Sequence, residues 1–447
     1  MRSIIHSIRE NPGLAIFMLA LLLRAAWVVT LDNVLVWPDE QEFAAVARHI
    51  VAGDGYVSSS YRANPVVPVY LSSFLWLFGE NWLLPRLGQA VIGALTCTLL
   101  YRLTGLLASR GAAVAAGLML AIYPAHIYLT GVFYVTSLAT FLSILTVHLI
   151  VVATGSRTPL RWAVLAGCVL GLTALTRATY LVYAPAACLA LVWADPSRWR
   201  KLVPAAAALG VAMVVVVAPW CVRNSTVFGQ PMLISSGLWE TLWKGTNEVA
   251  DGSADDRNMA WATPLWTSRL DRMSQPERKE VVATYDRIAT DVQESYQRTG
   301  DIFLSRDEVL RPHVVGYIAD NPGRFATLFA RKIVTLFQAF SDTEKRNTYT
   351  SGEKKLIAAV TFYPVLALAL VGLVLAAPSH RRAAPVYFMV LGFVALYGVL
   401  TACTRFRLPI DPFLMIFAAL PLDRVLGRAA DRAWLLQRIP HPTRART

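Results

Sequence analysis

Two adjacent carboxylates, Asp39 and Glu40, directly follow Pro38 in the first segment between apolar runs. Proline at the first helical position predicts a helix start, and the helix dipole favours carboxylates in the first turn. The pattern predicts that this helix continues to Val51 and ends at Gly53. Because few basic residues share the segment, one carboxylate is suited to act as a general base. A capped interfacial helix without chemistry would show the same residues.

Two arginines, Arg405 and Arg407, stand one residue apart just before Pro409, where the last apolar run begins. Guanidinium groups bind phosphate through paired hydrogen bonds. At a membrane edge that phosphate would belong to a lipid, although arginines there can also be plain interfacial anchors. Other cations, tyrosines and amides lie at similar boundaries. The phosphate-binding candidates are Arg405, Arg407, Arg223 and Lys244, and the substrate-binding candidates are Tyr56, Tyr61, Tyr70, Asn224 and Asn247.

Metal ligands and cysteines form no motif in this sequence. No Cys/His spacing resembles a zinc site, and the histidines do not cluster. His126 or His313 could join a carboxylate on a metal, so a divalent metal stays open without support from ligand spacing. We therefore expect no cofactor from the sequence.

Apolar runs must position these side chains. Of the 447 residues, 55% are apolar and 16% are charged, against about 45–50% and about 25% in soluble domains. This composition excludes disordered, fibrous and small disulfide-stapled proteins and disfavours a soluble two-domain enzyme. We divide the run 162–194 at Arg177, because an arginine in mid-membrane is costly. About ten spans are expected, at residues 13–31, 83–107, 111–127, 131–153, 162–177, 179–194, 202–221, 356–377, 385–402 and 408–423.

Two hydrophilic segments interrupt the apolar runs. We expect an N-terminal transmembrane core at 1–221 that includes a first outer loop at 32–82, an outer helical segment at 222–355, and C-terminal transmembrane helices with a basic tail at 356–447. Pro65 and Pro68 predict an extended return to the membrane. Asn321-Pro322 predicts the start of an amphipathic interfacial helix that reaches Phe340.

The net charge of +13 indicates orientation rather than a nucleic-acid partner. The basic residues form no patch interleaved with aromatic residues. Their excess falls in the short loops on the side of the two termini, and the positive-inside rule places that side in the cytoplasm. The two hydrophilic segments, and any chemistry they carry, are therefore expected at the outer face of the membrane.

Taken in order, these motifs resemble the membrane glycosyltransferases of the GT-C fold. The nearest group is formed by bacterial proteins like those of glycosyltransferase family 39. These are similar to dolichyl-phosphate-mannose protein mannosyltransferases and to the aminoarabinose transferases that modify lipid A. Two departures are visible: Tyr134–Leu138 lacks the acid that members often carry there, and Asn64–Pro68 lacks the usual glycine. The resemblance covers most of the chain and rests on Asp39-Glu40, Phe43, Ala47, Gly53-Asp54-Gly55-Tyr56, Pro65, Pro68-Val69-Tyr70, Arg86, Gln89, Tyr123-Pro124, Leu175-Thr176-Arg177, Ala218-Pro219-Trp220, Arg223-Asn224 and Arg405-Phe406-Arg407-Leu408-Pro409.

The resemblance implies an all-α, polytopic GT-C-like bundle in a bacterial plasma membrane. It implies inverting transfer of a sugar from a polyprenyl-phosphate donor, similar to undecaprenyl phosphate, to a hydroxyl of a lipid, glycan or protein. Asp39 would be the general base and Glu40 its supporting neighbour, while the cations named above would receive the leaving phosphate.

A flippase or transporter of lipid-linked sugars is the alternative function. Such a protein would need polar groups inside the spans and often contains inverted repeats. No inverted repeat is visible in the sequence, and few residues are charged within the expected spans, among them Arg24, Arg86 and Arg102. A third possible function, that of a non-catalytic membrane scaffold, does not explain Asp39-Glu40 or the arginines near Pro409. The expected partners are the lipid donor, the acceptor and membrane lipids, and nucleic acid is not among them.

Overall fold

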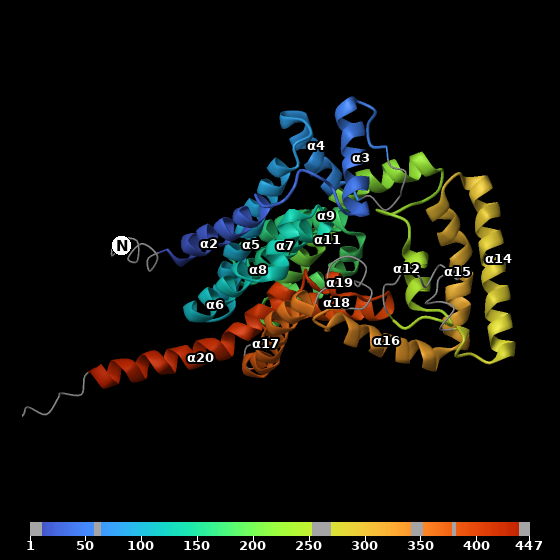
Figure 1. Ribbon diagram of the computed structural model, residues 1–447. Helices are drawn as coiled ribbons and strands as arrows, with labels where there is room; N and C mark the ends of the chain where they lie inside the picture. The colour runs from blue at the N-terminus through green and yellow to red at the C-terminus, as the bar shows by residue number, and fades with distance from the viewer. Residues whose placement is uncertain (1–10, 58–63, 253–269, 341–351, 378–380, 438–447) are drawn as a thin grey trace, which may run out of the picture.

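The computed structural model describes residues 11–57, 64–252, 270–340, 352–377 and 381–437. Within these ranges the chain is helical and contains no β-strand. Figure 1 shows a bundle of helices with a helical arm at one end. The apolar elements are α2 (Pro12–Val28), α5 (Leu83–Leu107), α6 (Arg110–Ala121), α7 (Pro124–Tyr128), α8 (Val135–Gly155), α9 (Pro159–Thr176), α10 (Tyr183–Ala194), α11 (Trp199–Phe228), α17 (Gly352–Ala376), α18 (Ala384–Val399) and α20 (Asp411–Gln437).

The apolar helices indicate a multi-pass membrane protein. Five of them, in α5, α8, α9, α11 and α17, are long and apolar enough to cross a membrane. Helix α6 meets the segment formed by α7 and the short turn η1 (Leu129–Gly131) at a bend of 53°, and together they would make a sixth span. Each of the ten expected spans coincides with an apolar helical element, but α2, α10 and α18 belong to shorter helices. The expected number of about ten spans is therefore not confirmed.

The long apolar run that begins at residue 162 is broken at Arg177, as the sequence predicts. Helix α9 ends at Thr176, Arg177 adopts an extended backbone with φ of −155°, and the turn η2 (Ala178–Val182) leads into α10. The break removes Arg177 from a continuous helix, so its side chain can leave the apolar surroundings of the run.

The first hydrophilic segment forms two helices, α3 (Pro38–Ala52) and α4 (Val66–Phe78). Helix α3 starts at Pro38 and ends at Gly53, whose φ of +90° closes the helix, which confirms both predicted ends. The predicted extended return at Pro65 and Pro68 is wrong, because α4 already begins at Val66. Proline is tolerated in the first turn of a helix, where its missing N–H would have no intrahelical partner.

The apolar side chains of the first segment form a small core of their own. Phe43 and Ala47 of α3 pack with Val67 and Leu71 of α4, and Phe133 lies in the same cluster. This packing attaches the helix that carries Asp39 to the turn that precedes α8.

The second hydrophilic segment supplies α12 (Leu238–Gly245), α14 (Gln275–Thr299), α15 (Ile302–Asp320) and α16 (Pro322–Leu336). Its core joins Trp243 of α12, Tyr285 of α14 and Leu310 of α15. Helix α16 begins at Pro322, as predicted, and ends four residues before the predicted Phe340. Figure 1 places α14 and α15 side by side at the tip of the arm, with α12 and α16 nearer the bundle.

Candidate functional site

A short turn between α18 and α20 brings together the two charged motifs that the sequence singles out. This turn contains α19 (Thr404–Arg407), and Arg405 Nη1 lies 3.1 Å from Asp39 Oδ2. The side chains of Arg405 and Asp39 are 38% and 48% exposed. An ion pair between residues 366 positions apart in the chain therefore sits on an accessible surface, where both groups can also meet a ligand.

Aromatic rings frame the Asp39–Arg405 pair. The guanidinium carbon of Arg405 lies 4.6 Å from the centre of the Tyr134 ring. The ring of Trp37, next to the start of α3, lies 6.3 Å from that of Tyr134. The segment Tyr134–Leu138, which lacks an acidic residue, therefore contributes an aromatic ring that packs against the guanidinium group of Arg405.

A second guanidinium, that of Arg177, lies beside this pair. Its carbon is 4.6 Å from the Phe406 ring and 5.5 Å from the Tyr397 ring, while the guanidinium carbon of Arg405 lies 5.8 Å from the same Phe406 ring. Within the described ranges, no carboxylate pairs with Arg177. The candidate residues predicted from the sequence do not include Arg177, although an arginine at a break in an apolar run was the available signal.

Glu40 has a different environment from its neighbour Asp39. Its side chain is 1% exposed, and Oε2 accepts hydrogen bonds from the main-chain N–H groups of Val36 and Trp37 at 3.1 and 3.0 Å. Oε1 accepts a third from Phe133 N–H at 2.9 Å. Glu40 thus fastens the start of α3 to the turn before α8 and positions Asp39 without facing solvent.

Glu40→Gln is expected to destabilise the protein by about 1–3 kcal/mol, because an amide NH2 would face buried N–H groups in place of one acceptor oxygen. Thermal unfolding of the purified protein measures this loss. Glu80→Gln is the matched control, since Glu80 is 57% exposed and pairs with Arg48, and an exposed pair contributes about 1 kcal/mol or less. Equal melting temperatures for the two variants would contradict the positioning role of Glu40.

Arg407 is directed away from the Asp39–Arg405 pair. Its side chain is 1% exposed, Nε donates to Asp411 Oδ1 at 2.8 Å, and Nη1 donates to the carbonyls of Leu336 and Gln338. Tyr123 donates its hydroxyl hydrogen to the other oxygen of Asp411. Arg407 therefore joins the ends of α16 and α20 inside the protein.

Arg223, Tyr56 and Asn224 meet at a second junction between the first segment and α11. Arg223 donates to the Tyr56 carbonyl at 2.6 Å and to Asn224 Oδ1 at 3.0 Å. The Tyr56 ring packs edge-on against Trp220 at 4.7 Å, and Asn224 Nδ2 donates to the Ile234 carbonyl. These contacts tie the end of the first segment to the arm.

The remaining predicted residues lie within local contacts. Lys244 pairs with Glu240 at 3.0 Å in the same helix and is 12% exposed. Asn247 is fully buried, donates to a main-chain carbonyl of α12 and accepts a main-chain N–H. Tyr70 donates its hydroxyl hydrogen to a main-chain carbonyl at the start of α5. Tyr61 lies outside the described residues.

A buried lysine supports the turn that carries Arg405. Lys332 of α16 is 0% exposed, and its ammonium donates to the Val399 carbonyl at 2.8 Å and to the Thr246 hydroxyl at 3.2 Å. On the other side of the turn, Ala402 N–H donates to the Gly252 carbonyl. Burial lowers the pKa of Lys332 to about 7.

We expect Lys332 to contribute a rise in the stability of the folded protein between pH 7 and pH 10. In this range the unfolded chain binds the Lys332 proton, with a pKa of 10.5, while the folded chain has lost it, so raising the pH favours folding. The pKa difference corresponds to about 5 kcal/mol, a cost that is complete below pH 7 and disappears above the unfolded pKa. Thermal unfolding at several pH values measures it. Lys332→Met should flatten the profile relative to a control, Lys279→Met at an exposed lysine, and an unchanged profile would contradict the assignment.

Metal ligands do not gather in the described part of the chain. No three His, Cys, Asp or Glu side chains there are placed to hold a metal ion. His126 uses a ring nitrogen on the Leu408 carbonyl at 3.0 Å, which joins α7 to the turn before α20.

The fold is that of membrane glycosyltransferases of the GT-C class. One similar solved structure is the archaeal oligosaccharyltransferase AglB from Archaeoglobus fulgidus in complex with an inhibitory peptide and a dolichol-phosphate, with a TM-score of 0.57 and 14% identity over 98% of this chain and 53% of that one. Its apo form matches with a TM-score of 0.55 and 16% identity over 95% and 52%. The chain thus spans about half the length of AglB, and identities this low show the fold alone.

The family comparison agrees with the fold. Residues 62–222, a range that includes α4 and most of α11, match the family model of the dolichyl-phosphate-mannose-protein mannosyltransferases. This match confirms the resemblance stated from the sequence. ArnT from Cupriavidus metallidurans bound to undecaprenyl phosphate is a weaker structural likeness, with a TM-score of 0.45 and 16% identity over 96% of this chain and 81% of that one. Among curated proteins, none matches this sequence.

Proposed function

We propose that this chain is a membrane glycosyltransferase that transfers a sugar from a polyprenyl-phosphate donor to an acceptor hydroxyl. The observation that carries the proposal is the accessible Asp39–Arg405 pair, which combines a potential base with a phosphate-binding cation. The family match of residues 62–222 and the dolichol-phosphate bound to AglB support a lipid phosphate as the ligand class.

In the proposed reaction, Asp39 accepts the proton of the acceptor hydroxyl while that oxygen attacks the anomeric carbon of the sugar. The bond from the anomeric carbon to the phosphate oxygen breaks, and the polyprenyl phosphate leaves with the bonding electrons. A single displacement of this kind inverts the anomeric configuration. Arg405 has donors besides the one on Asp39, so it can hold the carboxylate and the phosphate together.

Arg177 supplies the second cation of the proposed phosphate site. The two guanidinium groups and the one carboxylate leave an excess positive charge around Phe406. The phosphate gains negative charge as the sugar leaves, so these cations stabilise the leaving group more than the donor. The predicted phosphate contacts of Arg407, Arg223 and Lys244 stay predictions, since their observed hydrogen bonds and ion pairs engage other groups.

The orientation belongs to the same proposal. The short-loop arginines and lysines support cytoplasmic termini and a site at the outer face of a bacterial plasma membrane. The acceptor would then be a lipid, glycan or protein exposed at that face.

Undecaprenyl phosphate is a direct probe, because it is the product of the proposed reaction whichever sugar is carried. We expect the purified full chain in lipid nanodiscs to bind it in native mass spectrometry. With a radiolabelled undecaprenyl-phosphate sugar and membrane extract as the acceptor source, we expect a labelled glycoside of inverted anomeric configuration. Absence of binding would overturn the proposal, and transport of the labelled lipid without a glycosidic product would favour the flippase.

A further inference from the structure

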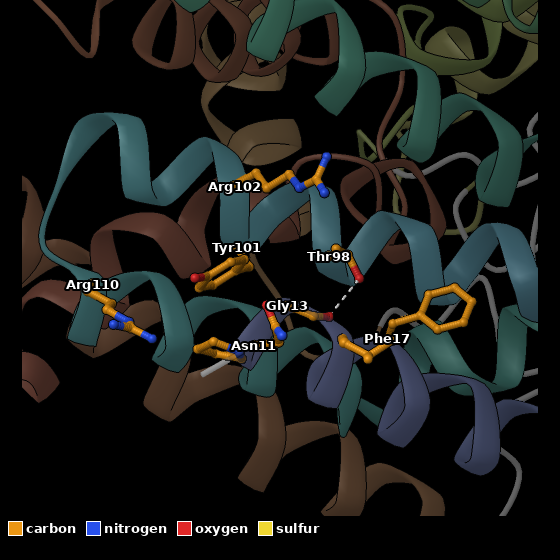
Figure 2. A pocket seen from close by; sticks show the side chains of 9 residues that line it. Asn11, Gly13, Phe17, Thr98, Tyr101, Arg102 and Arg110 are labelled. Atoms are coloured by element: carbon orange, nitrogen blue, oxygen red, sulfur yellow. Dashed lines mark hydrogen bonds between the residues drawn. The ribbon is translucent and has the colours of Figure 1, made fainter. Parts of the chain in front are cut away.

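A pocket lined by cationic, polar and apolar residues lies at the end of α2 remote from Asp39. Figure 2 shows it where the start of α2 meets α5 and the first residue of α6. Its volume is about 540 Å³, and it lies at the first turns of α2, a helix of 17 residues that rises about 25 Å toward the first hydrophilic segment. The lining residues are Asn11 to Leu14, Phe17, Thr98, Tyr101, Arg102 and Arg110.

Two cations, Arg102 and Arg110, and three uncharged polar side chains, Asn11, Thr98 and Tyr101, line this pocket. Arg102 and Arg110 are exposed, and Figure 2 shows Arg110, Tyr101 and Asn11 around one side of the opening. No carboxylate is among the described residues that line it. Asp423 of α20, which lies nearby, accepts a hydrogen bond from the Ser109 hydroxyl at 2.6 Å.

The floor of the pocket is a close contact between α2 and α5. Thr98 Oγ1 donates to the Gly13 carbonyl at 3.4 Å. A Cβ on Gly13 would lie 3.3 Å from the Tyr101 ring, so the absence of a side chain there lets Tyr101 pack on the helix start. The pocket is therefore defined by helix packing and does not depend on the side-chain positions of the arginines alone.

An apolar strip leads away from the pocket along α2. Leu14, Met18 and Leu22 are 58%, 56% and 67% exposed, at a spacing of four residues that places them on one face of the helix. The strip runs about 12 Å from the pocket toward the middle of the apolar bundle. A polar, cationic pocket followed by an exposed apolar strip matches an amphiphile that carries a negative charge at one end.

We infer that this pocket binds the phosphodiester headgroup of an anionic phospholipid, with an acyl chain along Leu14, Met18 and Leu22. Guanidinium groups bind phosphate oxygens in pairs, and basic pockets between membrane helices hold anionic headgroups. The site is separate from the proposed donor site and does not depend on the proposed function.

Native mass spectrometry of the full chain tests this inference with phosphatidylglycerol, phosphatidylcholine and undecaprenyl phosphate as separate probes. We expect phosphatidylglycerol to bind more tightly than phosphatidylcholine. The double variant Arg102→Gln/Arg110→Gln should bind phosphatidylglycerol about tenfold more weakly while binding undecaprenyl phosphate normally. The matched control is Arg381→Gln/Arg382→Gln, which removes the same charge from an exposed loop outside the pocket and should bind both lipids normally.

Two further experiments distinguish binding of a lipid headgroup from binding of free phosphate. Leu14→Gln/Met18→Gln should also weaken phosphatidylglycerol binding, because it interrupts the apolar strip. Inorganic phosphate at millimolar concentration should not displace the lipid. Equal binding of the two phospholipids, equal losses in the pocket and control variants, or full displacement by inorganic phosphate would each overturn the inference.

Discussion

Asp39→Asn is expected to lower the rate of sugar transfer by about 10²–10⁴-fold, the range that a positioned general base contributes. The asparagine side chain has the same shape, and its amide oxygen can still accept the Arg405 hydrogen bond, which is 3.1 Å long with Asp39. The geometry of the pair is therefore retained, while the group that accepts the acceptor proton is lost. The measurement is the initial rate of polyprenyl phosphate release at saturating donor.

Asp54→Asn provides the matched control for this variant. Asp54 lies in the same segment and is 57% exposed, but it pairs with His49 and not with an arginine. It should transfer sugar at the rate of the unaltered protein. Both variants should bind undecaprenyl phosphate and unfold at the same temperature as the unaltered protein. Full activity of the Asp39→Asn protein would contradict the assignment of Asp39 as the general base. It would not contradict the proposed phosphate site.

Arg405→Ala is expected to lower transfer by about 10²–10³-fold, the loss found when one preorganised donor to a developing charge is removed. Both kcat and the affinity for undecaprenyl phosphate should fall, because Arg405 would contact the phosphate before and after the sugar leaves. Arg405→Lys should be intermediate, since an ammonium keeps the charge but loses the paired geometry. Arg177→Ala should weaken phosphate binding through the same Phe406 surface.

A comparison of Arg407→Ala with Arg405→Ala distinguishes an arginine that stabilises the fold from one that acts in catalysis. The Arg405 side chain is 38% exposed, so removing it should change the free energy of unfolding by about 1 kcal/mol or less. Arg407 is buried with Asp411, and removing one partner of a buried pair costs about 3–5 kcal/mol. We expect a thermal shift for Arg407→Ala and almost none for Arg405→Ala. The reverse pattern would contradict the assignment of the two arginines.

Local patterns predicted several elements of this fold correctly. Pro38 and Gly53 mark the two ends of α3, and Arg177 marks the break after α9, because each acts through the backbone or the solvation of its own residue. Pro65 and Pro68 misled the prediction, since a proline fits an extended strand and the first turn of a helix equally well.

The amino-acid sequence by itself determined that this is an apolar helical chain and which carboxylates and arginines stand at the ends of its helices. Only the tertiary structure decided how they are used. Arg405 and Arg407 are equivalent in sequence, but successive helical residues are rotated by about 100°, so α19 turns one toward Asp39 and the other toward Asp411. Asp39 and Glu40 diverge for the same reason, one accessible and one buried. Composition and local spacing do not encode that direction, because it depends on which distant helix packs against each face.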